Sequence, residues 1–209
     1  MDYKIDIAIC IDPSGKVGEH IDDIKSYAVC FLDEILTSAE ESGHNISALR
    51  VKFIQVSSPE SGERSITETD FYSFTNGEEK EKISEVLDSV KPNGGVTKYD
   101  NFYELLKCAF NSDWTDADGA RHVTAIWSDA PEVNFLLGTE EQTDRKLDEL
   151  SGIWNANWTN GRAKRLFLFT PETEPWTDIQ LWDCVYYPID PTDCHPSDFD
   201  SLATFIWGI

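Results

Sequence analysis

The chain has 209 residues, 40% of them hydrophobic, and a formal net charge of −22. Its length fits a single α/β domain over residues 1–209 better than two domains, and its apolar content excludes a disordered chain. The negative charge repels phosphate backbones and anionic lipids, so nucleic acid and membrane surfaces are poor partners. A cation or a protein with a basic face is favoured, although acidity also serves solubility alone.

The start of the chain and its cysteines predict a cytoplasmic protein. Residues 1–4 lead directly into a strand pattern and lack the basic and apolar regions of a signal peptide. No stretch approaches the roughly 20 apolar residues that a membrane-spanning helix needs. The 5 cysteines are odd in number and scattered, which indicates reduced thiols rather than a disulfide framework.

Apolar periodicity predicts alternating strands and helices along the first half of the chain. A nearly continuous apolar run over 4–11 predicts a strand buried on both faces. Apolar residues at spacings of three and four predict a helix over 18–38. The following patterns predict a strand at 48–56, a polar loop at 59–70, a short edge strand at 71–74 and a helix at 78–90.

The second half continues the same alternation after a Pro-Asn-Gly-Gly break at 92–95. Strands separated by helices predict a Rossmann-like, doubly wound, mostly parallel sheet of about six strands with helices on both faces. Ligands of such sheets bind beyond the carboxyl ends of the strands, where the strand order reverses. The predicted elements are a helix at 100–111, a strand at 122–128, a helix at 140–154, strands at 165–169 and 184–189, and a closing helix carrying Phe199, Leu202, Ala203 and Ile206.

Polar loops follow three of these segments and open on the same edge of the predicted sheet. Asp12 and Ser14 follow the first strand, Thr97 follows the Gly-rich break, and Asp129 follows the central strand. Together they offer two carboxylates and two hydroxyls, and no nitrogen or sulfur ligand. Oxygen ligands of this kind suit Mg²⁺ or Mn²⁺ better than zinc.

The order and spacing of these loops resemble the von Willebrand factor type A (VWA) family, in its bacterial cytoplasmic form. That family's metal-ion-dependent adhesion site has Asp-x-Ser-x-Ser on the first loop, Thr on the second and Asp on the third. The resemblance implies the VWA fold, and it implies that Asp12, Ser14, Thr97 and Asp129 bind Mg²⁺, or Mn²⁺ in its place. Further stretches resemble the family's strands and Gly-rich turn, so the resemblance covers essentially the whole chain: 6–12, 49–53, 94–106 and 121–131.

Lys16 departs from the family pattern, because it stands where the family has the second serine ligand. A protonated ammonium only donates hydrogen bonds and cannot ligate a cation. Either the side chain turns to solvent and leaves the oxygens to the metal, or the ammonium replaces the metal against Asp12 and Asp129. A separate interpretation of both aspartates is helix capping after their strands.

The resemblance implies an adhesion-type module that binds a partner protein at the carboxyl edge of the sheet, through a partner carboxylate on Mg²⁺. It also implies a partner such as a chaperone-like ATPase, or a kinase or phosphatase. One alternative is a metal-free scaffold in which Lys16 replaces the cation. Another is a metal-dependent phosphohydrolase, but Ser14 stands where such an enzyme needs a second carboxylate. We therefore expect binding rather than catalysis.

Overall fold

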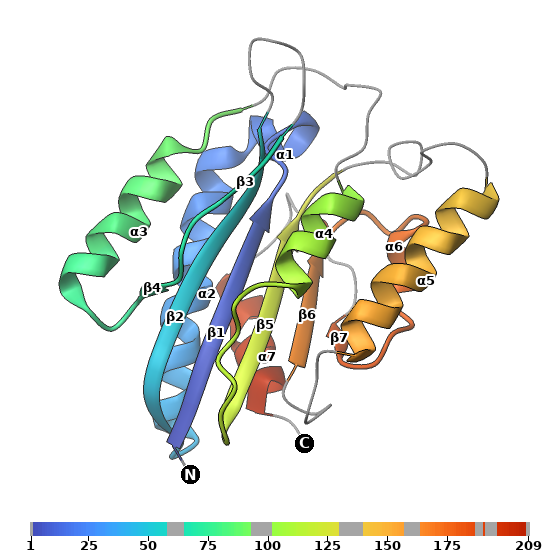
Figure 1. Ribbon diagram of the computed structural model, residues 1–209. Coiled ribbons are helices and arrows are strands. Elements are labelled where there is room, and N and C mark those ends of the chain that lie inside the picture. The colour runs from blue at the N-terminus through green and yellow to red at the C-terminus, as the bar shows by residue number, and fades with distance from the viewer. Residues whose placement is uncertain are drawn as a thin grey trace.

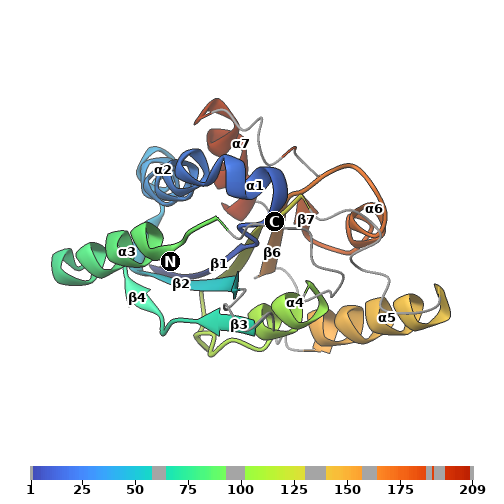
Figure 2. The same cartoon turned by 90° about the horizontal axis from the view of Figure 1, so that it is seen from above.

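The computed structural model has a layered α/β architecture, with one sheet between two groups of helices (Figures 1 and 2). It describes residues 2–57, 65–92, 102–129, 140–156, 164–186, 190 and 196–207. The described strands are β1 (Asp2–Ile11), β2 (Asn45–Ser57), β3 (Ser65–Glu68), β4 (Tyr72–Ser73), β5 (Ala120–Trp127), β6 (Lys164–Phe169) and β7 (Val185–Tyr186). The described helices are α1 (Gly15–Glu19), α2 (Ile21–Glu41), α3 (Gly77–Ser89), α4 (Phe102–Phe110), α5 (Glu140–Ala156), α6 (Trp176–Ile179) and α7 (Pro196–Trp207).

The sheet has the order β3-β2-β1-β5-β6-β7, and β4 also pairs with β2. β1 pairs in parallel with β2 and with β5, and parallel pairing continues through β6 to β7. The strand order reverses between β1 and β5, because the chain adds β2 on one side of β1 and β5 on the other. This topology confirms the predicted doubly wound, mostly parallel sheet with helices on both faces. It places the switch point where Ile11 pairs with Trp127.

The predicted number of six strands was wrong, because seven strands pair within the part of the chain that the structure describes. The stretch at 59–70, expected to be a polar loop, contains β3, which pairs antiparallel with the end of β2. Only Ile66 of the four residues in β3 is apolar, so hydrophobic alternation gives almost no signal there. The edge strand expected at 71–74 is β4, which is also antiparallel to β2.

The helix expected over 18–38 was also wrong in one respect, because it is divided into α1 and α2. His20 separates the two helices, because its φ of −108° and ψ of 23° lie outside the helical range. The short helix α6 had no prediction. Both differences concern segments of four or five residues, which are too short for a helical apolar period to emerge.

The core has one layer on each face of the sheet, and β1 contributes to both. Ile7, Ile9 and Ile11 enter the layer that includes α2, α3 and α7. Ala8 and Cys10 enter the layer that includes α4, α5 and α6. All five side chains are buried, which is why the last five residues of β1 are apolar without alternation.

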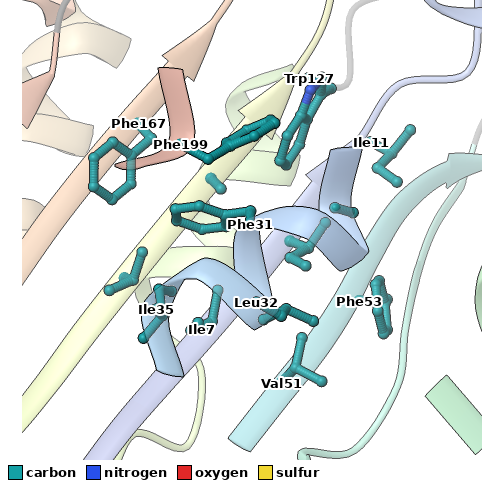
Figure 3. Packing of buried hydrophobic residues seen from close by; sticks show 14 of the residues in the cluster. Ile7, Ile11, Phe31, Leu32, Ile35, Val51, Phe53, Trp127, Phe167 and Phe199 are labelled. Atoms are coloured by element: carbon teal, nitrogen blue, oxygen red, sulfur yellow. The ribbon is translucent and has the colours of Figure 1, made fainter. Parts of the chain in front are cut away.

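Aromatic side chains pack α2 and α7 against the sheet (Figure 3). The ring of Phe31 on α2 lies 5.4 Å from that of Phe167 on β6 and 6.0 Å from that of Phe199 on α7, measured between centroids. Trp127, the last residue of β5, stacks on Phe169 at 4.2 Å. Such contacts stabilise beyond the area that they bury. The loops that follow β1 and β5 therefore start from a firmly packed base.

A buried carboxylate lies toward the opposite end of the sheet. Asp6 of β1 is 1% exposed and pairs in register with Arg50 of β2 and His122 of β5. Its oxygens accept hydrogen bonds from Arg50 Nε and Nη2, at 2.8 and 2.7 Å, and from the backbone N–H of Thr115, at 2.6 Å. The Thr115 carbonyl accepts a hydrogen bond from His122 Nε2 at 2.8 Å. This network holds the connection between α4 and β5 against the sheet.

Replacing His122 by glutamine should make stability less sensitive to acid. Burial lowers the pKa of His122 below 6.5, against the opposing effects of the Thr115 carbonyl and Asp6. The unfolded chain therefore binds this proton at a higher pH than the native chain does, and stability falls as the pH drops below about 6.5. We expect the fall in melting temperature between about pH 7.5 and 5.5 to be smaller in His122→Gln than in the wild type.

The control is Ser26→Asn, since Ser26 is an exposed residue of α2 and the change removes no titratable group. This variant should keep the pH dependence of the wild type. An unchanged pH dependence in His122→Gln would show that another group causes the acid sensitivity.

Among the described helices, none combines the length and the apolarity that crossing a lipid bilayer requires.

Candidate functional site

The first loop of the site follows β1 at the switch point. Asp12 is fully buried, and its backbone N–H donates to the Trp127 carbonyl at 3.0 Å, which ties the loop to the end of β5. One carboxylate oxygen of Asp12 accepts a hydrogen bond from the Ser14 backbone N–H at 3.2 Å. Ser14 is 7% exposed and is the N-cap residue of α1, but its side chain makes no capping hydrogen bond. Its hydroxyl is thus not used by the helix that it starts.

The third loop reaches the first through Asp129. The Asp129 carboxylate accepts a hydrogen bond from the backbone N–H of Lys16, across 113 residues of sequence. It also lies directly against Gly15, where an added Cβ would be 2.8 Å from Oδ1 and closer still to Oδ2. Gly15 has a φ of +53°, a conformation that favours glycine. Gly15 therefore allows both the turn and the close approach of the carboxylate.

Of the two aspartates for which helix capping is an alternative to metal binding, only Asp129 accepts a hydrogen bond from an N–H within a described helix. Asp12 accepts from the N–H two residues later, which is a local turn. Asp129 satisfies an N–H in the first turn of α1, which would otherwise lack a partner. A carboxylate has about four acceptor positions, so the bond from the Lys16 N–H does not by itself prevent Asp129 from binding a cation. Capping and metal binding are compatible here.

The charge of Asp129 is affected by burial and by Lys16 in opposite directions. Half-burial raises the pKa of Asp129 above its usual value. The backbone N–H and the positive charge of Lys16 lower it, but they do not fully offset the effect of burial. The Lys16 side chain is exposed and forms no ion pair with any described residue. Of the two arrangements considered for Lys16, the structure has the one in which the ammonium faces solvent.

Gly18 fixes the position of the same loop from the other side. An added Cβ at Gly18 would overlap the Pro13 carbonyl oxygen and would lie 3.6 Å from Pro92, just after α3. At Gly18, α1 therefore packs closely against Pro13 of the loop and against the segment that follows α3. Thr97, the fourth predicted ligand, lies outside the described residues.

The residues present fit a hard divalent cation by their chemistry. Asp12, Ser14 and Asp129 supply only oxygen, and they gather around one tight turn at the carboxyl edge of the sheet. Among the described residues, no group of three or more His, Cys, Asp or Glu side chains has a metal-binding arrangement. The candidate site therefore depends on hydroxyl oxygens in addition to its two carboxylates.

Sequence reasoning named the side chains but missed two backbone contributions. The N–H of Lys16 and the bare Cα of Gly15 position Asp129, yet neither belongs to the pattern of ligand types. A Gly three residues after Asp12, at the start of a helix, was the available signal for the positive φ. The contact with Asp129 could not be inferred, because it joins loops far apart in sequence.

No family model matches the chain, and no curated protein is similar enough to match it. Proximal thread matrix protein 1 from the mussel byssus (crystal form 2) superposes with a TM-score of 0.50 at 12% identity, covering 98% of this chain and 47% of that protein. The pilus adhesin SpaC from Lactobacillus rhamnosus GG, in its open conformation, has a TM-score of 0.43 at 18% identity, covering 60% of this chain and 14% of SpaC. This chain thus spans less than half the length of either protein. The likeness to the byssus protein concerns the fold alone.

Proposed function

We propose that the chain is a protein-interaction module of the VWA type, which binds a partner protein at the carboxyl edge of its sheet through a Mg²⁺-dependent contact. The observation that supports this function most is the gathering of Asp12, Ser14 and Asp129 at the turn around Gly15. That turn lies at the switch point between β1 and β5, where doubly wound sheets bind their ligands.

In this proposal, Asp12, Ser14, Thr97 and Asp129 hold the ion, and Mg²⁺ supplies a coordination position that a carboxylate of the partner can fill. Asp12 contributes a buried negative charge, and Asp129 contributes a second one that Gly15 and the Lys16 N–H orient. The exposed ammonium of Lys16 stands at the rim of the site. It would weaken the binding of a cation and would favour the approach of an acidic partner.

The module would act by binding rather than by catalysis. Ser14 occupies the position where an aspartate-nucleophile phosphohydrolase needs its acid–base carboxylate. An ATPase, a kinase or a phosphatase remains the expected class of partner, on the strength of the family resemblance. Incubation with a generic phosphate ester and Mg²⁺ should give no hydrolysis above background. Turnover that disappears in Asp12→Asn would contradict the binding role.

Magnesium should stabilise the native chain, and the variant Lys16→Ser should bind it more tightly. Lys16→Ser removes a positive charge and restores the hydroxyl of the family pattern. A ligand that binds only the native state adds about 1.4 kcal/mol of stability at ten times its dissociation constant. The melting temperature should therefore rise with Mg²⁺ concentration in the wild type, and at lower concentrations in Lys16→Ser. Calorimetric titration measures the two affinities directly.

Lys82→Ser is the matched control, because Lys82 is an exposed lysine on α3, remote in sequence from the site. It changes the net charge equally and should leave the Mg²⁺ affinity at the wild-type value. Equal, undetectable Mg²⁺ binding in the wild type and in Lys16→Ser would refute the metal site. If only Lys16→Ser bound Mg²⁺, the natural protein would be the metal-free scaffold instead.

A further inference from the structure

A groove of about 550 Å³ lies between α2 and α3, away from the candidate metal site. Both helices cover the same face of the sheet, as Figure 2 shows from above. The apolar part of the groove is formed by Val29 and Cys30 of α2 and by Leu87 of α3. Val29 and Cys30 pack against the core but remain partly exposed, so the groove offers solvent an apolar surface.

The length of the groove suits a short helical segment. Its α2 side extends from Lys25 to Glu34, which is about 14 Å at 1.5 Å per residue, or between two and three helical turns. A peptide that binds by strand addition needs a free sheet edge, and one that binds as a polyproline helix needs aromatic walls; the described lining of this groove, between two helices, offers neither. A helix satisfies its own backbone and needs from the groove only side-chain contacts.

The polar rim of the groove is acidic. Asp33 and Glu34 lie on the α2 side and Asp88 on the α3 side. Asp33 pairs with Lys80 at 3.3 Å, whereas Glu34 and Asp88 form no ion pair with the residues that the structure describes. Lys25, the one cation among the described lining residues, is itself paired with Asp22 at 3.3 Å. Among the described lining residues, the charged side chains without an ion pair are therefore the carboxylates of Glu34 and Asp88, and the Lys91 ammonium lies beside Asp88, where it donates to the Asp88 backbone carbonyl at 2.9 Å.

The pKa of the Cys30 thiol is consistent with this acidic rim. Burial raises the pKa of Cys30, and the charges of Glu34 and Asp33 raise it further. The carboxylates thus lie close enough to the thiol to act on it. A thiol with a raised pKa is a poor nucleophile, which argues for a contact surface rather than a catalytic one.

We propose that this groove is a second docking surface, and that it takes a basic amphipathic helix of a partner protein. Apolar side chains of that helix would cover Val29, Cys30 and Leu87, and its Lys or Arg residues would pair with Glu34 and Asp88. This mode combines apolar anchors with complementary charge, as helix-in-groove complexes do. It depends neither on Mg²⁺ nor on Lys16.

A synthetic amphipathic helix with Leu on one face and Lys on the other tests the proposal. Its affinity for the whole chain, measured by fluorescence anisotropy, should fall about tenfold in the double variant Glu34→Lys/Asp88→Lys, because two attractions become repulsions. The matched control is Asp144→Lys/Asp148→Lys on exposed positions of α5, which changes the net charge equally. The affinity of the peptide for this control should fall by less than about twofold. An equal loss in both double variants, or no binding of the peptide, overturns the proposal.

The alkylation rate of Cys30 is a second measurement of peptide binding, and it does not depend on the net charge of the chain alone. The peptide should slow the reaction of Cys30 with a maleimide, followed by mass-spectrometric peptide mapping, and should leave the rate at Cys108 unchanged. Cys108 is an internal reference on the other face of the sheet, and a long reaction time is needed because burial and Glu68 raise its pKa to about 12. Protection of Cys30 by hexylamine but not by the peptide would identify a site for small organic cations and would overturn the proposal, as would equal rates with and without peptide.

Discussion

Replacing Gly15 by alanine should lower the free energy of unfolding by about 3 kcal/mol and should abolish any stabilisation by Mg²⁺. Two costs add at this position. The φ of +53° strains any residue that has a Cβ. The methyl group would also lie 2.8 Å from Oδ1 of Asp129, so the carboxylate must leave its place against the turn. Displaced, Asp129 loses the hydrogen bond from the Lys16 N–H and its place against the turn that starts α1.

Gly43→Ala separates these two costs, because Gly43 has a φ of +68° and a Cβ there would meet nothing within 4 Å. It should cost about 1 kcal/mol, the backbone strain alone. Urea denaturation of both variants measures the difference between their free energies of unfolding. The same experiment with Mg²⁺ tests whether the ion still stabilises each variant. Equal destabilisation by the two substitutions would mean that Asp129 moves aside freely and is not held in place by the turn.

The order of the elements could be predicted because most of them bury enough residues for a clear period. β1 is continuously apolar from Ile7 to Ile11 since both of its faces are covered there, and α2 and α3 bury residues at helical spacing. β3 could not be predicted, because it is held by backbone pairing to β2 and only Ile66 of its side chains is apolar. The break at His20 is equally local and leaves the apolar spacing of α2 intact.

The candidate site was predictable as a set of side-chain types and only partly as an arrangement. Parallel strands end at the same edge of a sheet. Because β1 and β5 are adjacent, the loops that carry Asp12 and Asp129 lie side by side. The sequence could not choose between the two arrangements of Lys16, because both are open to a long, flexible stem. The structure also shows a contact of Lys16 that the ligand pattern did not predict, because its backbone N–H donates to Asp129. Its ammonium forms no ion pair with the described residues.

The second large effect is expected at Asp6, a residue that the sequence presents only as a member of the first strand. Its partner Arg50 is 44 positions away, and only the register between β1 and β2 brings the two side chains together. Asp6→Ala removes a buried carboxylate that accepts two hydrogen bonds from Arg50 and one from the Thr115 N–H. The guanidinium loses its counter-ion while its side chain is only 33% exposed. We expect a loss of about 3 kcal/mol, at the lower end for a broken buried pair because Arg50 is partly solvated.

Asp2→Ala is the control, since Asp2 lies on the same strand and accepts a single exposed hydrogen bond from Asn45. It should change the free energy of unfolding by less than about 0.5 kcal/mol. Arg50→Met in the Asp6→Ala background should recover part of the loss, because an apolar stem of similar length replaces a cation that has lost its counter-ion. Phe71 can pack against that stem, as it now lies 4.7 Å from the Arg50 guanidinium carbon. If the double variant were less stable than Asp6→Ala by the full cost of Arg50→Met alone, the two residues would be uncoupled, and the loss at Asp6 would come from the Thr115 contact.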